Sequence, residues 1–158
     1  MVKRIADIIM ETLTEYEIID CFAVVGGGAM YLDNALLKCK KMNKYFQHHE
    51  QACAMAAEAY ARYSGRMAAV CVTSGPGATN TLTGVLGAWQ DSLPMLVLSG
   101  QVRYEISVPK SGLPLRYRGL QEFEIIPSVK NMTKYAVMIT DPLSVKRELV
   151  KAIQIAMD

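Results

Sequence analysis

Short strand-like runs alternate along this chain with segments of helical periodicity. The runs cover residues 21–25, 45–48, 68–73, 95–99 and 135–140, and the helical patterns cover 3–16, 29–38, 50–63, 78–90 and 142–157. Most of the runs are apolar without period-two polarity, which indicates strands covered on both faces. We therefore predict an α/β fold, a three-layer α/β/α sandwich with a mainly parallel sheet.

The size and charge of the chain limit its class. A length of 158 residues with 51% apolar residues is enough for one domain with a substantial core. Seventeen basic and fifteen acidic residues are scattered and leave a net charge of +2, so nucleic acid is a poor candidate partner. Asp7 and Glu11 interrupt the first apolar stretch before it reaches the length of a signal or spanning segment. We expect a cytoplasmic protein with no membrane partner.

The cysteines and histidines do not form a recognisable metal site. The cysteines, at 21, 39, 53 and 71, are far apart and lack any Cys-x-x-Cys pair or nearby histidine cluster. We predict buried free thiols and no metal ligands. His48 and His49 are adjacent, and neighbouring strand residues point to opposite faces, so we predict core or surface packing for them rather than a pair of metal ligands.

Unusual residues follow the strand-like runs. In parallel α/β sheets, ligands bind beyond the carboxyl ends of strands, and these ends carry GGG, HHE, TSGPG and SGQ. Gly26-Gly27-Gly28 lacks the spacing of the dinucleotide fingerprint, and Gly75-Pro-Gly77 lacks the Lys-Ser/Thr of a phosphate loop. Either glycine segment could be a tight structural turn. The second is also rich in special residues, because Pro76 fixes the backbone and Asn80 offers a donor and an acceptor.

Glu50 lies where a strand gives way to an alanine-rich helix. One interpretation is a carboxylate favoured by the positive end of that helix, worth roughly 0.3–1 kcal/mol. The other is a desolvated carboxylic acid, kept partly protonated by burial, that gives a proton to a ring nitrogen and takes it back. Glu58 and Arg62 are four residues apart on the predicted helix, so we interpret them as an exposed ion pair without a function. Residues 101–121 form a loop longer than usual, which is typical of functional segments.

Five segments occur in a characteristic order. They are His49-Glu-Gln51, Ala57-Glu-Ala-Tyr-Ala-Arg62, Thr73-Ser-Gly-Pro-Gly-Ala-Thr-Asn80, Asp91-Ser-Leu-Pro94 and Ser99-Gly-Gln-Val102. Together they resemble the N-terminal, pyrimidine-binding domain of thiamine-diphosphate-dependent enzymes, in the acetolactate synthase-like family. The resemblance runs from about Lys3 to the C-terminus, and the ordered series is more specific than any one motif.

The resemblance implies a role for each candidate residue. Glu50 would protonate N1′ of the aminopyrimidine of thiamine diphosphate, so that the C2 ylide forms and attacks a 2-keto acid. Gln121 looks like the glutamine that faces the reacting centre. The cofactor-binding residues would be Gly26, Gly27, Glu50, Pro76 and Asn80. The chain departs from the family pattern at Val25, where proline is usual, and in segment 103–118, which is longer than in acetolactate synthases.

The family also implies parts that these residues do not contain. A second domain holds the diphosphate through Mg²⁺ and is marked by Gly-Asp-Gly, which does not occur in the 158 residues. We expect residues 1–158 to be an N-terminal pyrimidine-binding domain cut before its last strand, with the central and diphosphate-binding domains absent. Family active sites lie between subunits, which implies a homodimer or homotetramer. Some members also carry FAD, outside this segment. We expect this chain alone to be inactive.

Three functions remain open at this point. The chain is the N-terminal part of an acetolactate synthase-like carboligase or decarboxylase, the pyrimidine-domain subunit of a two-chain keto-acid decarboxylase, or a non-catalytic dimerisation module. The residues of the HEQ and GPGATN motifs, which resemble acetolactate synthase, and the missing final strand favour the first function over the second. The presence of Glu50 argues against the third, because a domain used only for packing has no evident need of an acid there.

Overall fold

The sheet consists of four parallel strands in the order β2-β1-β3-β4. The computed structural model describes residues 3–158. The strands are β1 (Asp20–Ala23), β2 (Asn43–Phe46), β3 (Ala68–Val72) and β4 (Met95–Ser99). The register pairs Cys21 of β1 with Ala69 of β3, and Val70 of β3 with Val97 of β4. Because all pairs are parallel, every connection must cross a face of the sheet, and the carboxyl ends of the strands gather at one edge.

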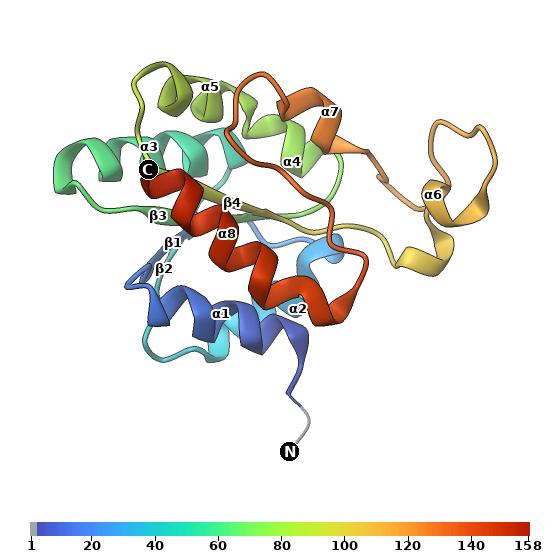
Figure 1. Cartoon of the computed structure of the whole chain (residues 1–158), viewed down its shortest axis with the longest axis horizontal. Coiled ribbons are helices and arrows are strands. Elements are labelled where there is room, and N and C mark those ends of the chain that lie inside the picture. The colour runs from blue at the N-terminus through green and yellow to red at the C-terminus, as the bar shows by residue number, and fades with distance from the viewer. Residues whose placement is uncertain (1–2) are drawn as a thin grey trace.

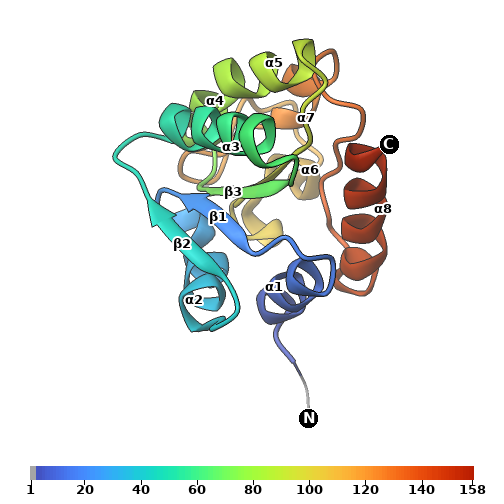
Figure 2. The same cartoon turned by 90° about the vertical axis from the view of Figure 1, so that its left-hand side faces the viewer.

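Helices cover both faces (Figures 1 and 2). One layer contains α1 (Ile5–Glu15), α2 (Met30–Lys38) and α8 (Val145–Met157), and the other contains α3 (Glu50–Ser64), α4 (Pro76–Asn80) and α5 (Leu82–Gln90). Short 3-10 turns, η1 (Gly27–Ala29) and η3 (Pro142–Ser144), precede α2 and α8. The predicted three-layer α/β/α fold with a parallel sheet is confirmed.

Strand β3 shows why the sequence pattern is continuous rather than alternating. All five of its residues are buried. Ala69 and Cys71 join the core cluster beneath α1, α2 and α8, whereas Val70 and Val72 join the cluster beneath α3. A strand packed on both faces needs apolar side chains at every position.

A buried carboxylate anchors the opposite end of the sheet. Asp20, at the start of β1, accepts hydrogen bonds from Asn43 Nδ2 at 3.0 Å, Tyr45 Oη at 3.1 Å and Tyr60 Oη at 2.7 Å. Burial acts to raise the pKa of Asp20, but the three hydrogen bonds outweigh it, so the pKa lies below its usual value. The network ties β1 to β2 and α3.

Residues 135–140, predicted as a strand, are not part of the sheet. Within residues 3–158 this extended segment makes no strand pairing. Its first residue, Tyr135, instead donates a hydrogen bond to Glu148 Oε2 at 2.5 Å and lies under Lys151, whose Nζ is 4.5 Å from the ring centroid. The start of the run is therefore tied to α8, and the strand prediction was wrong because periodicity cannot show whether a neighbouring strand is available.

Several helix bounds also differ from the prediction. The segment 78–90 belongs to two helices, α4 and α5, which are separated at Thr81.

Helix α5 lies close to α3. A Cβ on Gly84 of α5 would lie 2.6 Å from the Cβ of Ala54, so the glycine lets the two helices approach. The predicted Glu58–Arg62 pair forms at 2.8 Å, and Arg62 also pairs with Asp91 at the end of α5. These contacts fix α5 against α3.

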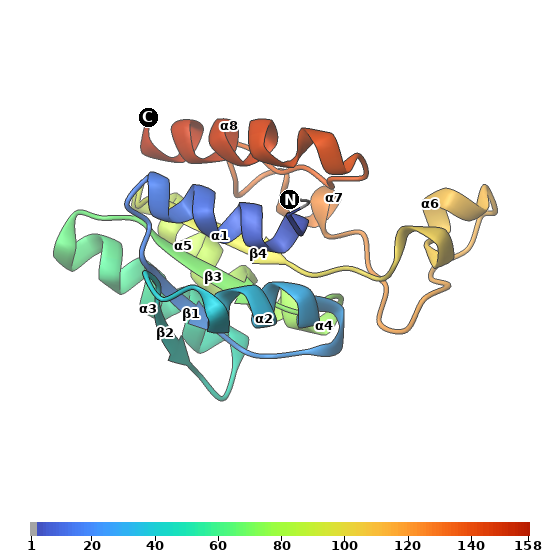
Figure 3. The same ribbon diagram turned by 90° about the horizontal axis from the view of Figure 1, so that it is seen from below.

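The long segment after β4 has structure of its own. It contains η2 (Tyr104–Ile106) and α6 (Val108–Ser111), and α7 (Ile125–Val129) follows it. The part around α6 projects from the body of the molecule (Figures 1 and 3). In residues 3–158 no helix is both long and apolar enough to cross a membrane.

Candidate functional site

A single threonine joins the turns that follow β1 and β3. Thr73 fills a space bounded by three glycines: a Cβ on Gly26 would lie 2.5 Å from the Thr73 Cβ, and one on Gly77 would lie 2.6 Å from its Cγ2. The backbone N–H of Gly28 donates to Thr73 Oγ1 at 3.0 Å. These separations leave no room for side chains at Gly26 or Gly77, so the glycines let the two turns meet.

The turn after β1 is held by a buried acid. Gly26 N–H donates to Asp33 Oδ2 at 3.1 Å, and the Cys71 thiol lies 3.9 Å from Oδ1. Burial raises the pKa of Asp33 above its usual value. Gly27 is exposed, and a Cβ there would have nothing within 4 Å. Gly26 is thus a packing position as well as a candidate site residue, whereas Gly27 faces open space.

Glu50 is the first residue of α3, and its carboxylate meets the end of α4. Asn80 Nδ2 donates to Glu50 Oε2 at 2.9 Å. The other oxygen, Oε1, lies 3.5 Å from the Cβ position of Gly77, and no donor among residues 3–158 is hydrogen-bonded to it. The carboxylate therefore has one oxygen fixed by an amide and one available to a ligand.

The cap of α3 comes from a different residue. The backbone N–H of Gln51 donates to His49 Nδ1 at 3.1 Å, so the imidazole caps the helix. His48 and His49 are both exposed, so core packing is ruled out, and His49 has a surface role as the cap of α3. His49 thus accepts from one of the free N–H groups of the first turn, and Glu50, as the first helical residue, lies after the cap position.

Glu50 is half-buried in this chain rather than enclosed. Gly77 and Asn80 lie against its carboxylate, and part of the residue remains exposed. The desolvation expected of a working acid is therefore only partial among residues 3–158. Its position at the start of a fifteen-residue helix adds the favourable field of the helix dipole to either interpretation.

Gln121 reaches the same turn through its backbone. Gly75 has φ 57° and ψ −116°, and a Cβ there would lie 2.2 Å from the carbonyl oxygen of Gln121. Gln121 itself has φ 57°, an uncommon conformation for a residue with a side chain. Pro76 follows Gly75 as the first residue of α4 and is exposed. The long loop thus returns its last residue to the turn after β3.

The structure brings the six predicted residues into one neighbourhood. Contacts link Gly26 through Thr73 to Gly77 and Glu50, while the carbonyl oxygen of Gln121 lies against Gly75, the residue before Pro76. The six residues are Gly26, Gly27, Glu50, Pro76, Asn80 and Gln121. Sequence reasoning assigned no role to Thr73 or Asp33. Gly28 lies 45 residues from Thr73, so that contact depends on the fold, whereas Gly26 lies only seven residues from Asp33, and no motif in the sequence marked that pair.

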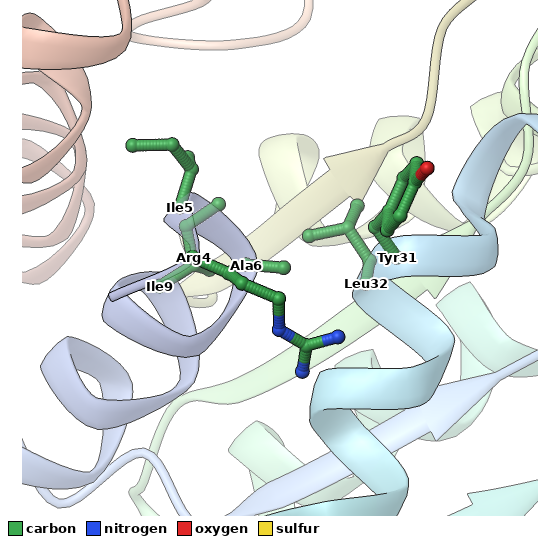
Figure 4. A pocket seen from close by; sticks show the side chains of 6 residues that line it. All are labelled: Arg4, Ile5, Ala6, Ile9, Tyr31 and Leu32. Carbon is green, nitrogen blue, oxygen red and sulfur yellow. The ribbon is translucent and has the colours of Figure 1, made fainter. Parts of the chain in front are cut away.

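Another hollow lies elsewhere on the molecule. A pocket of about 370 Å³ between α1 and α2 is lined mainly by apolar side chains (Figure 4); its lining residues are Arg4, Ile5, Ala6, Ile9, Tyr31 and Leu32. It belongs to the helix layer opposite α3 and α4, so it is separate from Glu50 and Asn80. Among the described residues no cluster of three or more His, Cys, Asp or Glu side chains could hold a metal ion.

Comparison with known proteins points to one family. Residues 3–124 match the model described as "Thiamine pyrophosphate enzyme, N-terminal TPP binding domain". Acetolactate synthase 1, chloroplastic, of Oryza sativa subsp. japonica is 34% identical over 157 residues, covering 98% of this chain and 23% of that protein. The acetolactate synthase large subunit of Lactococcus lactis subsp. lactis is 32% identical over 151 residues, covering 96% and 25% respectively. The chain spans about a quarter of the length of these relatives.

Proposed function

This chain belongs to the family of N-terminal TPP-binding domains of thiamine pyrophosphate enzymes, and from that premise we propose that it activates thiamine diphosphate for a 2-keto acid decarboxylase or carboligase similar to acetolactate synthase. The acid is Glu50, which holds and moves a proton at N1′ of the aminopyrimidine. The observation that supports this most strongly is the carboxylate with one oxygen bound by Asn80 and the other open.

The residues present fit the pyrimidine side of the cofactor. Gly27 has open space where a Cβ would stand. Without a side chain there, a flat ring can lie close to the backbone. Pro76 is exposed at the turn after β3, and Asn80 presents an amide beside the acid. Gly26 and Gly27 would line the ring, Glu50 would meet its nitrogen, and Pro76 and Asn80 would approach it from the other turn.

The chemistry divides between cofactor and protein. Bound thiamine diphosphate supplies an electron sink for decarboxylation of the keto acid. This chain supplies the proton: Asn80 holds Oε2 of Glu50 by a hydrogen bond of 2.9 Å, which directs the proton-bearing oxygen away from the amide. General acid–base groups of this kind typically contribute a rate factor of about 10²–10⁴. Gln121, on the returning loop, would face the reacting centre.

The proposal places the diphosphate contacts outside this chain. Among residues 3–158 no acidic or histidine cluster is suited to the Mg²⁺ that a diphosphate needs. A diphosphate-binding domain of another subunit would supply them, in a homodimer or homotetramer. The isolated chain would then bind the cofactor weakly and give no turnover, and measurable decarboxylation by the purified chain would contradict this.

The test compares thiamine with thiamine diphosphate as ligands of the ¹⁵N-labelled chain. If this chain contacts only the pyrimidine side, both should shift the amide signals of Gly27, Gln51 and Asn80, with dissociation constants within about threefold of each other, a difference of under 1 kcal/mol. The Glu50→Gln variant should need about tenfold more ligand to reach the same response, a loss of about 1.4 kcal/mol, and Glu58→Gln, in the same helix, should respond like the wild type. Shifts confined to residues outside this neighbourhood would overturn the proposal.

A further inference from the structure

The loop between β4 and α7 is closed at its base by side-chain contacts. Gln101 Nε2 donates to the carbonyl oxygen of Phe123 at 2.8 Å, and the Val102 N–H donates to Gln101 Oε1 at 2.9 Å. A Cβ on Gly119 would lie 2.7 Å from Val102 Cγ1. The two ends of the loop therefore lie side by side, although the segment between them projects from the body (Figure 3).

Glu122 binds the inside of this loop. Its Oε1 accepts from the backbone N–H of Val108 at 2.6 Å, and its Oε2 accepts from the N–H groups of Arg118 and Gly119, each at 2.9 Å. Burial acts to raise the pKa of Glu122, but these backbone hydrogen bonds outweigh it and the pKa is lowered. One carboxylate thus joins backbone positions from both arms of the loop.

The residue before this carboxylate is Gln121. Its carbonyl oxygen lies 2.2 Å from the Cβ position of Gly75, and its φ of 57° is a conformation that persists only where the surroundings enforce it. The contacts of Glu122 fix the chain on one side of Gln121, and the Gln101–Phe123 hydrogen bond fixes it on the other. The loop base therefore determines where Gln121 meets the turn after β3.

We infer that Glu122 is a positioning residue: its carboxylate closes the loop 102–121 through three backbone amides and thereby sets Gln121 against Gly75 beside the candidate site. That this position serves catalysis rests on the proposed function. The placement of Gln121 by Glu122 does not, and it can be measured without a cofactor.

Glu124 provides a matched control. Glu122 and Glu124 both line a pocket of about 320 Å³ inside the loop, but among residues 3–158 only Glu122 accepts the hydrogen bonds that close it. Arg116 lines the same pocket, and Arg118 lowers the pKa of Glu122 further through its charge. A general loss of negative charge would therefore affect both glutamate variants alike, whereas loss of the clamp would affect one.

The first measurement is the amide spectrum of Glu122→Gln and Glu124→Gln in the ¹⁵N-labelled chain. In the first variant we expect changed signals for Val108 and Gly119 and also for Gly75, which contacts Gln121, the neighbour of Glu122 in the chain. Trypsin cleavage after Arg103, Lys110, Arg116 or Arg118 should rise about tenfold, equivalent to about 1.4 kcal/mol of loop-opening free energy. The free energy of unfolding in urea should fall by no more than this amount, and Glu124→Gln should resemble the wild type.

A pH titration of the wild type serves if the variant does not fold. The signals of Val108, Gly119 and Gly75 should titrate together, with one midpoint below the ordinary glutamate pKa of about 4.3. The inference would be overturned if these signals had different titration midpoints. It would also be overturned if the Gly75 signal changed neither in the titration nor in Glu122→Gln. A closed loop with no response to thiamine would instead leave the inference standing and count against the proposed function.

Discussion

The side-chain amide of Asn80 lies 2.9 Å from the carboxylate of Glu50, at the junction of α4 and α3. Thirty residues separate the two in the chain, and the turn after β3 brings them together. The contact orients the carboxylate and leaves Oε1 for a ligand. Replacing Asn80 should therefore change ligand binding more than it changes folding.

We predict that Asn80→Asp weakens the response to thiamine at least tenfold, because a second carboxylate beside Glu50 repels it and removes the amide donor. The cost in the free energy of unfolding should be about 0.5–1.5 kcal/mol, the value of one partly exposed hydrogen bond. Ligand titration and urea unfolding measure the two effects. Asn131→Asp, at an exposed loop position, is the control and should change neither.

Gly26→Ala and Gly27→Ala should separate packing from binding. A Cβ on Gly26 would lie 2.5 Å from Thr73 Cβ, while one on Gly27 meets nothing within 4 Å. We expect Gly26→Ala to lower the free energy of unfolding by about 1–3 kcal/mol through overpacking. Gly27→Ala should stay within about 0.5 kcal/mol of the wild type but reduce thiamine binding. Equal stability of the two variants in urea would show that Thr73 can move aside.

The hydroxyl of Thr73 is predicted to matter apart from its shape. Thr73→Val keeps the shape but leaves the Gly28 N–H without its acceptor, which should cost about 1–3 kcal/mol. Thr73→Ser keeps the acceptor and should cost less. Unfolding curves that ranked Ser below Val would show that the methyl group, rather than the hydroxyl, joins the two turns.

Acid should weaken the fold through Asp20. Because the folded state lowers the pKa of Asp20, its contribution to stability is fully present above the unfolded pKa of about 3.9 and is lost as the pH falls through the lowered value. Asp20→Asn should remove this part of the pH dependence of the urea midpoint. Asp158→Asn, at the exposed end of the chain, should leave it intact, and an unchanged acid slope in Asp20→Asn would contradict the assignment.

The buried thiols should resist alkylation in the folded chain. Burial raises the pKa of Cys21 to about 12 and that of Cys53 to about 11, and raises that of Cys71 well above its usual value. Cys39 is half-buried. At pH 8, mass spectrometry after iodoacetamide treatment should therefore find Cys39 modified first and the other three only in denaturant. Early modification of Cys71 would show that β3 opens in the native state.

The sequence predicts the layers and the strand ends because both depend on local pattern. An unbroken apolar run predicts that β3 is buried on both faces, and the glycines after β1 and β3 indicate turns. The contact between Thr73 and three glycines could not be predicted, because it depends on how two turns approach in space. The failed strand at 135–140 has the same origin, since an extended run needs a neighbour that its own pattern does not specify.

The candidate site shows the same division. The residue types at Glu50 and Asn80 were conspicuous in the sequence, but their hydrogen bond required the fold. The cap of α3 by His49 and the binding of three loop amides by Glu122 depend on side-chain directions that spacing alone does not give. The partial exposure of Glu50 could not be predicted either, because it depends on which side chains the fold places around the carboxylate.

The central claim is that Glu50 gives its proton to the pyrimidine ring, and the ¹⁵N chemical shift of N1′ in labelled thiamine bound to the chain tests it most directly. In the wild type and in Glu58→Gln, N1′ should move towards the shift of the protonated ring. In Glu50→Gln, at ligand concentrations that still saturate the site, it should stay at the unprotonated value. An N1′ shift in Glu50→Gln equal to that of the wild type would contradict the account.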